Sequence, residues 1–393
     1  MLLPSALMIE QFTKMDRCRV CNGEFYHSPI LSFANSPASA QGFLSHPNEP
    51  AGEVDLFIYQ CRYCGLVQHD LPAVPYYKDA IRAVAFSEQM RAFRKKQLSA
   101  WLSETGMKDR RILEIGSGNG EYLDLLKEAG ASQVSGLEHS QNAIVITQEK
   151  GLDVRQGFLD KAFTNPWAEV FDGFAIFSFL EHWPDLNESL RCLHSLLAEG
   201  AQGLVEVPNF QFMVQNHLYS EFTPDHIYYF DQASLASVLD LNGFKVDAME
   251  SIWHDYIISA RVTRKVPLDG AGFRQRQAVV VKEITEFLEQ FEPHEVVIWG
   301  AGHQALAVMS MADLGARISH VIDSAVFKQG KYTPGTKLLI KSPQSLGDDR
   351  PKAMIIMAAG YSDEVLGVVQ RDYPDVQHVA VLREHGLEII QRA

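Results

Sequence analysis

A strand that runs directly into a glycine-rich turn restricts the fold of this chain more than any other feature. Residues 111–115 read Arg-Ile-Leu-Glu-Ile, and residues 116–120 read Gly-Ser-Gly-Asn-Gly. Apolar side chains at helical spacing follow, from Tyr122 to Leu126. A strand, a glycine turn and a helix start in this order indicate the opening of a doubly wound α/β sheet. The helix start also offers unpaired N–H groups to a ligand.

The residues on either side of this turn extend the α/β pattern. Residues 87–106 interleave apolar side chains with basic ones, Arg94 among them, and predict an amphipathic helix. After the turn, residues 133–137 predict a second strand that ends at Glu138. A carboxylate about twenty residues after a glycine turn is placed to accept hydrogen bonds from both hydroxyls of a ribose. The pattern therefore predicts a nucleotide-like cofactor.

The order of the glycines separates two classes of cofactor. A dinucleotide site requires Gly-x-Gly-x-x-Gly, whereas this turn reads Gly-x-Gly-x-Gly and is preceded by Glu114. Glu-x-Gly-x-Gly-x-Gly resembles motif I of the class I S-adenosylmethionine-dependent methyltransferases. Three later stretches match that family in order: residues 157–158 after a third strand, residues 171–178 as a fourth strand, and residues 180–185 as the loop after it.

This resemblance implies a set of cofactor contacts. In the family the glycine turn holds the cofactor, the acid after the second strand takes its ribose, and the residues after the third strand contact its adenine. The cofactor-binding residues implied for S-adenosylmethionine are Glu114, Gly116, Ser117, Gly118, Gly120, Glu138, His139, Gly157, Phe158, Ser178 and Glu181.

Four of the five cysteines form two Cys-x-x-Cys pairs that precede the glycine turn. Each pair can place two thiolates on adjacent corners of a tetrahedron, so two pairs favour zinc over redox or disulfide use. Four sulfur ligands leave no open coordination position, and the zinc is expected to be structural. Gly23 and Gly65 are expected to supply the backbone freedom of the two turns. The predicted metal ligands are Cys18, Cys21, Cys61 and Cys64.

Three features narrow the family. The cysteine pairs precede the methyltransferase motifs, residues 207–209 read Val-Pro-Asn, and residues 225–230 read Asp-His-Ile-Tyr-Tyr-Phe. Residues 328–336 carry Lys-Gln-Gly-Lys-Tyr-Thr-Pro-Gly-Thr. Together they resemble the sugar C-methyltransferases that act on nucleotide-linked keto-deoxysugars. The resemblance implies an α/β chain with a zinc-binding module (1–78), a class I methyltransferase domain of Rossmann-like fold (79–268), and a second Rossmann-like domain that binds substrate (269–393).

The chemistry of such a reaction requires a base. A carbon next to a ketone becomes nucleophilic only after it loses a proton, and histidine suits this task because its pKa of about 6.5 leaves it mostly neutral. His226 matches the histidine that the family uses as base, with Asp225 in place of a glutamate. The predicted catalytic residues are His226, Asp225, Tyr76, Tyr77 and His182.

One departure from the family lies three positions before that histidine. The family often has a tyrosine there, and this chain has Thr223. Tyr76, Tyr77 or Tyr219 are the candidates to supply the missing phenol. The departure motivates a second hypothesis, C- or O-methylation of a natural product that is not a sugar.

A second glycine loop lies in the C-terminal part. Residues 270–277 are interpreted as a linker into a helix over 278–291. Residues 300–305 then read Gly-Ala-Gly-His-Gln-Ala and Asp323 ends the next strand, which is a dinucleotide fingerprint when taken alone. Substrate binding, a purely structural unit and NAD binding all remain open here. The substrate-binding residues predicted over the whole chain are Asn209, Tyr219, Tyr229, Gly302, His303, Lys331, Tyr332 and Tyr361.

Composition and charge argue against several functions. A formal net charge of −14 does not fit a nucleic-acid-binding protein, which needs a basic footprint. No apolar run approaches the roughly 18 residues of a membrane span, and residues 1–4 do not resemble the start of a signal peptide. We expect a cytoplasmic protein, monomeric or homodimeric, that acts on a small molecule. A non-catalytic scaffold of two Rossmann domains and an NAD-dependent oxidoreductase are the alternatives from other classes.

Overall fold

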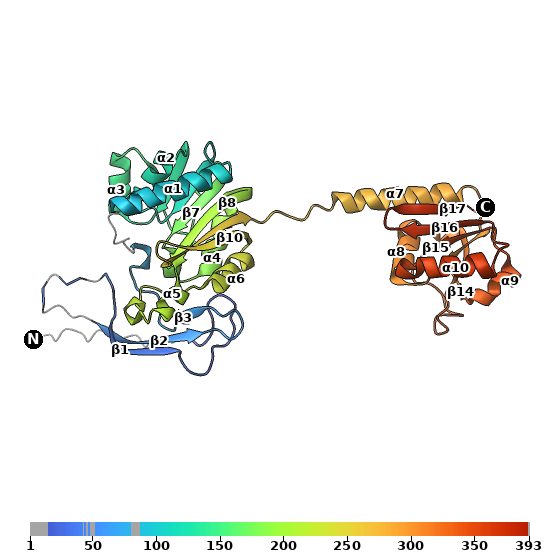
Figure 1. The fold of residues 1–393 in the computed structure, drawn as a ribbon, viewed down its shortest axis with the longest axis horizontal. Helices are drawn as coiled ribbons and strands as arrows, with labels where there is room; N and C mark the ends of the chain where they lie inside the picture. The colour runs from blue at the N-terminus through green and yellow to red at the C-terminus, as the bar shows by residue number, and fades with distance from the viewer. Residues whose placement is uncertain (1–14, 42, 45, 48–51, 80–86, 392–393) are drawn as a thin grey trace, which may run out of the picture. The chain divides into compact units, whose positions relative to one another are not determined.

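The computed structural model describes residues 15–41, 43–44, 46–47, 52–79 and 87–391. The chain divides into two compact units, Met1–Val266 and Pro267–Ala393, and each is described by itself (Figure 1). Residues 1–4, on which the prediction about a signal peptide rests, lie outside the described residues. Among the helices that are described, none has the length and apolar character needed to cross a membrane.

A seven-stranded sheet forms the centre of the first unit, with the strand order β10-β11-β8-β7-β4-β5-β6. Its strands are parallel except β11, which runs antiparallel between β8 and β10. The chain moves outward from β4 to β5 and later returns to β7 on the other side of β4, so a crevice opens at the carboxyl ends of β4 and β7. The strands are β4 (Arg111–Ile115), β5 (Gln133–Glu138), β6 (Asp153–Gln156), β7 (Phe171–Phe177), β8 (Leu197–Pro208), β10 (Phe244–Ile252) and β11 (Ile257–Arg264).

Helices cover both faces of this sheet. One hydrophobic core joins the sheet to the first three helices, and a second core joins its other face to the fourth and sixth. The two predicted strands and the helix over 87–106 are therefore present. The helices are α1 (Glu88–Glu104), α2 (Glu121–Glu128), α3 (Gln141–Glu149), α4 (Leu186–Ser195), α5 (Phe210–Gln215) and α6 (Gln232–Leu241).

Arg94 differs from its expected place on the polar side of α1. Its side chain is buried and forms an ion pair with Glu206 of β8, which is buried as well. Gln97 and Ser259 donate hydrogen bonds to the other carboxylate oxygen of Glu206. The pattern of one helix does not reveal this pair because the partner lies 112 residues further along the chain.

Replacement of Glu206 by alanine is expected to lower the free energy of unfolding by about 3–5 kcal/mol, because it leaves the buried guanidinium of Arg94 without its counter-charge. Chemical denaturation of the purified protein measures this change. The matched control is Glu169→Ala, which breaks a pair in which Glu169 is 76% exposed. The control should lose less than about 1 kcal/mol. Equal losses in both variants would show that burial of the Arg94 pair contributes nothing.

A smaller antiparallel sheet carries the N-terminal cysteine-rich region, with the order β1-β2-β3-β9. Its last strand comes from the middle of the chain and follows His226 directly. Val67 pairs with Tyr229, and Gln68 pairs with Tyr228. The cysteine-rich region and the segment after His226 therefore fold as one sheet. The strands are β1 (Leu31–Pro37), β2 (Glu53–Gln60), β3 (Val67–His69) and β9 (Tyr228–Tyr229).

The second unit is a six-stranded α/β sheet with the order β14-β13-β12-β15-β16-β17. Its strands are parallel except the last, and the order reverses between β12 and β15. The strands are β12 (Val296–Trp299), β13 (Ile318–Ile322), β14 (Ile340–Lys341), β15 (Ala353–Ile356), β16 (His378–Arg383) and β17 (Gly386–Ile390). The helices are α7 (Ala271–Leu288), α8 (His303–Met311), α9 (Leu346–Asp349) and α10 (Ser362–Asp372).

The interpretation of residues 270–277 as a linker is wrong, because α7 begins at Ala271. The guanidinium of Arg276, in the first half of this helix, donates hydrogen bonds to the carbonyl oxygens of Glu384 and His385. The polar stretch is thus anchored to the turn between β16 and β17. Residues 265–270 carry neither helix nor strand.

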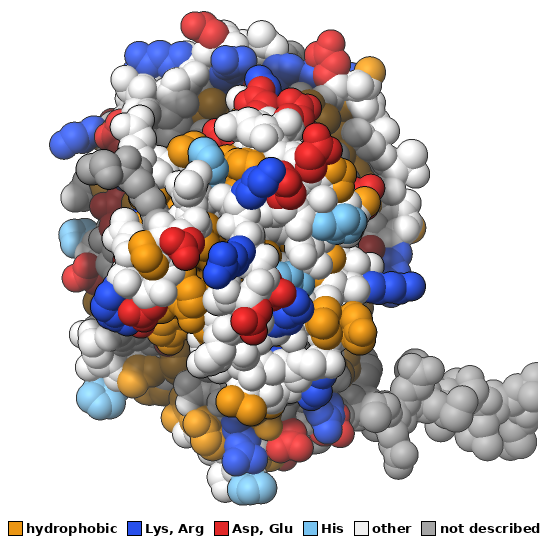
Figure 2. All heavy atoms as spheres, turned by 90° about the vertical axis from the view of Figure 1, so that its right-hand side faces the viewer, with side chains coloured by type: hydrophobic (Ala, Val, Ile, Leu, Met, Phe, Trp, Pro, Cys, Tyr) orange, Lys and Arg blue, Asp and Glu red, His pale blue; other side chains and the backbone are white. Residues whose placement is uncertain are grey.

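Acidic and basic side chains are interspersed on the face drawn in Figure 2, and neither sign of charge covers a continuous area of it. Hydrophobic side chains appear between them in small groups.

Candidate functional site

The four paired cysteines converge on one point. The Sγ atoms of Cys18 and Cys64 lie 3.6 Å apart, those of Cys21 and Cys61 lie 3.4 Å apart, and all four lie within 4.8 Å of one another. Sulfur ligands about 2.3 Å from a tetrahedral Zn²⁺ are about 3.8 Å apart, so the cluster has the size of a zinc site. None of the five cysteines forms a disulfide. Close approach of the Cys64 thiol lowers the pKa of Cys18 to about 5, which favours a thiolate there.

The two cysteine turns reach the cluster in different ways. Gly65 has φ +75°, as expected for a residue that supplies backbone freedom, whereas in the first turn Asn22 takes the left-handed conformation with φ 57°. Gly23 is required for space instead: a Cβ atom there would lie 3.1 Å from the Sγ of Cys21 and 2.5 Å from the ring of Tyr63. A residue larger than glycine at position 23 would therefore enter the space around the sulfur atoms.

All three glycines of the turn after β4 adopt positive φ, with φ 71° at Gly116, 51° at Gly118 and 85° at Gly120. The backbone N–H of Gly118 donates a 2.8 Å hydrogen bond to Glu138, whose other oxygen accepts from the N–H of Ser140. Both carboxylate oxygens keep a further lone pair for a ligand hydroxyl. The predicted pairing of glycine turn and carboxylate is thus present at the carboxyl edge of the sheet.

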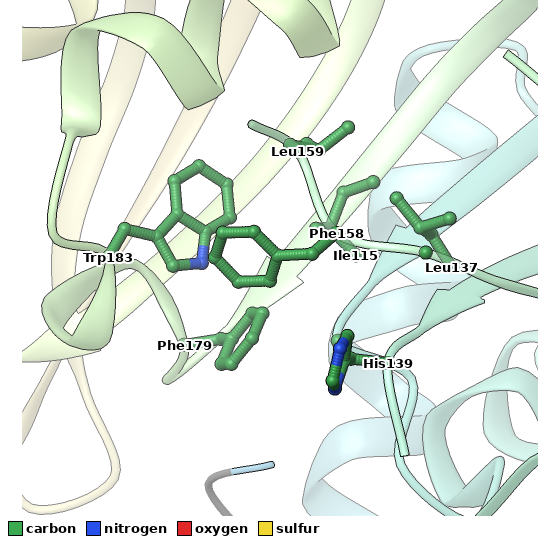
Figure 3. Close-up of a pocket in the computed structure, with 9 residues that line it drawn as sticks. Ile115, Leu137, His139, Phe158, Leu159, Phe179 and Trp183 are labelled. Carbon is green, nitrogen blue, oxygen red and sulfur yellow. The ribbon is translucent and has the colours of Figure 1, made fainter. Parts of the chain in front are cut away.

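An apolar pocket opens beside this turn (Figure 3). The rings of Phe158, Phe179 and Trp183 gather on one side of it, and His139 lies on the other. Phe158 and Trp183 meet edge to face with ring centroids 6.5 Å apart. The other lining residues are Ile115, Gly116, Leu137, Gly157 and Leu159. Aromatic walls and a floor of glycine suit a flat heterocycle.

Two residues predicted for the cofactor point elsewhere. The Ser117 hydroxyl is buried and has no hydrogen-bond partner among the described residues, and it packs toward Gly136 under the turn. Only the backbone of Ser117 is left for a ligand. Glu181 is also buried, and its carbonyl oxygen accepts a 2.9 Å hydrogen bond from the N–H of Ile227. Its carboxylate lies with the histidines described next. Glu114 is fully buried on β4, and Ser178, with φ 46°, ends β7 in a left-handed turn.

His226 lies at the junction of the two sheets, largely buried, with its ring centroid 4.8 Å from that of His182. The Nδ1 of His182 is 2.8 Å from the carbonyl oxygen of Asp225. Burial, with the neighbouring His182 and His69, lowers the pKa of His226 to about 3. Its imidazole has no hydrogen-bond partner among the described residues and is therefore a neutral, unengaged base.

Asp225 holds this segment in place through contacts of its own. Its carboxylate accepts hydrogen bonds from the Tyr76 hydroxyl at 2.6 Å, the N–H of Ala40 at 2.7 Å and the hydroxyl of Thr223 at 3.3 Å. The Tyr76 hydroxyl also lies 2.6 Å from the hydroxyl of Ser39. The carboxylate thus ties the His226 segment to the N-terminal region, and only the backbone of Asp225 reaches His182.

The three tyrosines considered as replacements at Thr223 are separated by the structure. Tyr76 joins Asp225 as described. Tyr77 instead packs edge to face on Phe158, with ring centroids 5.4 Å apart, on the side of the aromatic pocket. Tyr219 is 75% exposed. Of the three, Tyr76 is the one that contacts the His226 segment.

Two predicted substrate residues are committed to local structure. Asn209 caps α5: its side-chain oxygen accepts from the N–H groups of Gln211 and Phe212, and its amide donates to Ser251 and to the carbonyl oxygen of Asp255. The Tyr229 hydroxyl bonds to both the N–H and the carbonyl oxygen of Thr223. The amide of Asn209 is fully used within the protein and the hydroxyl of Tyr229 is tied to Thr223, and the role of both residues in substrate binding stays a prediction.

His69 belongs to the site and was not found from the sequence. Its Nδ1 accepts from the N–H of Leu71, and its Nε2 lies 3.1 Å from the carbonyl oxygen of Pro224. It thereby supports the loop before His226. Only the pairing of β3 with β9 brings it there, and nothing local signals that pairing.

In the second unit, Gly302 and His303 follow β12 and Tyr361 follows β15, the two strands between which the order reverses, whereas Lys331 and Tyr332 lie beside the edge strand β14. Gly302 and His303 are exposed at the start of α8. The carboxylate of Asp323 accepts hydrogen bonds from the N–H of Ala301 and from the ammonium of Lys328. Its negative charge is thus balanced by Lys328 within the protein. The remaining predicted residues are Lys331, which is exposed, Tyr332, which is 67% exposed, and Tyr361, which is 68% exposed.

Comparison with known proteins assigns both units. Residues 87–249 match the family described as "Methyltransferase domain", and residues 269–373 match the family described as "C-methyltransferase C-terminal domain". The C-methyltransferase NovU of Streptomyces niveus is 24% identical over 396 residues, which cover 90% of this chain and 91% of NovU. These matches support the assignment of the chain to the S-adenosylmethionine-dependent C-methyltransferases.

The two family matches confirm the methyltransferase class that the motifs predict. Similar solved structures include an S-adenosylmethionine-dependent methyltransferase from Mesorhizobium loti, 16% identical, with TM-score 0.35, covering 43% of this chain and 100% of that chain. Another is the magnesium protoporphyrin IX methyltransferase ChlM from Synechocystis PCC 6803 with bound SAH, 16% identical, with TM-score 0.36, covering 46% of this chain and 90% of that chain.

Gly116→Ala is expected to weaken S-adenosylmethionine binding by calorimetry at least about tenfold, equivalent to about 1.4 kcal/mol. A Cβ at Gly116 would lie 2.4 Å from the ring of Phe179, in addition to the strain of φ +71°. The control is Gly130→Ala, at φ +108° with nothing within 4 Å of the new atom. It carries the strain without the clash and should leave binding unchanged. Wild-type affinity in Gly116→Ala would contradict this account of the turn.

Proposed function

We propose that this C-methyltransferase methylates a carbon of a nucleotide-linked keto-deoxysugar, with His226 as the base. The observation that carries the proposal is the state of His226: a neutral imidazole without a hydrogen-bond partner among the described residues, fixed beside the carboxyl edge of the sheet. A histidine that abstracts a proton from carbon must be neutral and must have a free lone pair on one ring nitrogen. His226 meets both conditions.

We assign different roles to the residues around His226. His226 would remove the proton from the carbon next to the ketone and later give it to water. The enolate carbon would take the methyl group as the bond from sulfur to methyl breaks, which leaves S-adenosylhomocysteine. S-adenosylmethionine, when bound, supplies an electrophilic methyl group. His182 and Asp225 are positioning residues that hold the His226 segment, and Tyr76 positions Asp225 through the 2.6 Å hydrogen bond.

The cofactor contacts proposed here follow the geometry of the turn. Glu138 would accept hydrogen bonds from the ribose hydroxyls, and the backbone of Gly116 and Gly118 would approach the cofactor closely. Phe158 and Phe179 would contact the adenine. The support is the aromatic pocket next to the glycine turn and the carboxylate fixed at its rim by two backbone N–H groups.

We further propose a structural Zn²⁺ on the four clustered cysteines, within a module formed by residues 1–78. This module would help to position the base, since Ser39, Ala40 and Tyr76 all contribute to the contacts of Asp225. Residues 79–268 would hold the cofactor. In residues 269–393, the exposed loops where the strand order reverses support a role in substrate binding.

The pH dependence follows from the depressed pKa of His226. Because burial lowers it to about 3, the base of the free enzyme stays neutral through the mildly acidic range. We expect kcat/KM, which reports groups of the free enzyme, to stay flat from about pH 8 to about pH 5.5. Initial-rate measurements at subsaturating sugar nucleotide test this. An acid limb centred near the ordinary histidine pKa of about 6.5 would contradict it.

The substrate class is tested by comparing three ketones in reactions with S-adenosylmethionine: a nucleotide-linked 4-keto-deoxysugar, the same sugar without its nucleotide, and an aryl ketone without a sugar. Mass spectrometry should detect a methylated product with the first alone. Nuclear magnetic resonance of that product should place the methyl group on carbon. Methylation of the aryl ketone alone would favour the natural-product hypothesis.

A further inference from the structure

A carboxylate and two imidazoles, one of them that of the proposed base His226, lie close together in the first unit. The ligand atoms of Glu181, His182 and His226 all lie within 4.8 Å of one another. Zn²⁺ binds histidine nitrogen and carboxylate oxygen at about 2.0–2.2 Å, so its ligands on tetrahedral corners are about 3.4 Å apart. Small side-chain rotations would bring the three groups to that spacing.

The hydrogen bond of His182 prepares it to bind a metal. A carbonyl oxygen only accepts, so Nδ1 of His182 carries the proton that it shares with the carbonyl oxygen of Asp225. The lone pair of His182 is therefore on Nε2. A ligating histidine that donates its other N–H to a carbonyl oxygen is the usual arrangement around a protein-bound metal, because it fixes the tautomer and the ring orientation.

Two hydrogen bonds join the segments that carry the three side chains. His182 bonds to the carbonyl oxygen of Asp225, and the N–H of Ile227 bonds to the carbonyl oxygen of Glu181 at 2.9 Å. The three side chains thus come from two loop segments that these hydrogen bonds hold together. His69 lies nearby, but both of its ring nitrogens already have backbone partners, which leaves three protein ligands and an open fourth position.

We propose that Glu181, His182 and His226 bind a divalent first-row transition metal ion, Zn²⁺ in the first instance, and that the bound ion inhibits methyl transfer. Two imidazoles and a carboxylate suit Zn²⁺ and Co²⁺ and not Mg²⁺ or Ca²⁺, which prefer ligand sets of oxygen alone. The ion takes the lone pair of His226, which can then no longer accept a proton. The inhibitory effect rests on the proposed role of His226 as the base, whereas the metal site itself does not.

The test titrates the full-length protein, already holding one zinc at the four cysteines, with Co²⁺. We expect one further Co²⁺ per chain by calorimetry, with a visible spectrum that lacks the intense thiolate charge-transfer bands of a cysteine site. His182→Asn and Glu181→Gln should lose this second equivalent. His254→Asn is the matched control, because it removes an exposed histidine at a position with φ 59° that asparagine tolerates.

Each outcome decides one part of the proposal. A wild-type protein that takes up no second metal overturns the site, whether or not the variants fold. A second metal that persists in both variants places the ion elsewhere and also overturns it. If the second metal binds as expected but methyl transfer continues at an unchanged rate, the inhibition is refuted, and the role of His226 as base is refuted with it. Absence of methyl transfer to any keto-sugar would refute the proposed function and leave the metal titration valid.

Discussion

The variant His226→Asn is expected to lose methyl-transfer activity by about 10²–10⁴-fold in kcat, the usual contribution of a positioned acid or base. Asparagine keeps a polar side chain of similar reach but cannot accept a proton from carbon. S-adenosylmethionine binding should be unchanged, because His226 does not line the aromatic pocket. Single-turnover kinetics with saturating cofactor measure the loss, and calorimetry measures the binding.

The control for this variant is again His254→Asn, which changes an exposed histidine in the turn between β10 and β11. It should retain the wild-type rate. If His226→Asn keeps its rate within about threefold of wild type, less than 1 kcal/mol of barrier, another group must act as base. If it loses both rate and cofactor affinity, the effect is structural and the assignment of the base fails.

Loss of the proposed structural zinc is expected to have the second large effect. Structural Zn²⁺ contributes about 10–16 kcal/mol to the folding of small zinc peptides, as much as the whole stability of a typical domain. Cys61→Ser should therefore yield protein without zinc in which the small sheet is unfolded. Methyl transfer should be lost as well, because β3 pairs with β9 directly after His226. Elemental analysis, thermal denaturation and activity are the three measurements.

Cys192→Ser is the matched control, since Cys192 is half buried on α4 and lies outside the cluster. It should keep one zinc per chain and full activity. A zinc-free Cys61→Ser protein that still transfers methyl groups would show that the small sheet does not position the base. A Cys61→Ser protein that retains its zinc would show that the metal is held elsewhere.

The sequence predicts those parts of the fold that depend on residues close together in the chain. The strand, glycine turn and helix start from Arg111 to Leu126 are local, and the structure has them in the expected order. The convergence of the four cysteines can be predicted equally well, because each Cys-x-x-Cys pair can supply two of the four ligands of a zinc site. The glycine turn and its carboxylate also meet as expected, since adjacent parallel strands end at one edge of a sheet.

The parts that the sequence does not predict depend on distant partners. The pairing of β3 with β9 brings His69 to the loop before His226, and no local pattern encodes it. The residue pattern of α1 predicts Arg94 on the surface, whereas in the structure it forms a buried ion pair with Glu206. Asn209 lies in a motif that predicts contact with substrate, whereas in the structure its side-chain oxygen caps α5. In each case the tertiary partner, not the residue type, decides the role.

Hydrogen exchange at the carbon next to the ketone tests the central claim most directly. The nucleotide-linked keto-sugar is incubated in deuterated water with enzyme and S-adenosylhomocysteine, so that the cofactor pocket is filled and no methyl group can be transferred. Mass spectrometry of the recovered sugar should show deuterium with the wild-type enzyme and none above background with His226→Asn. Deuterium incorporation at equal rates in both enzymes would contradict the assignment of His226 as the base.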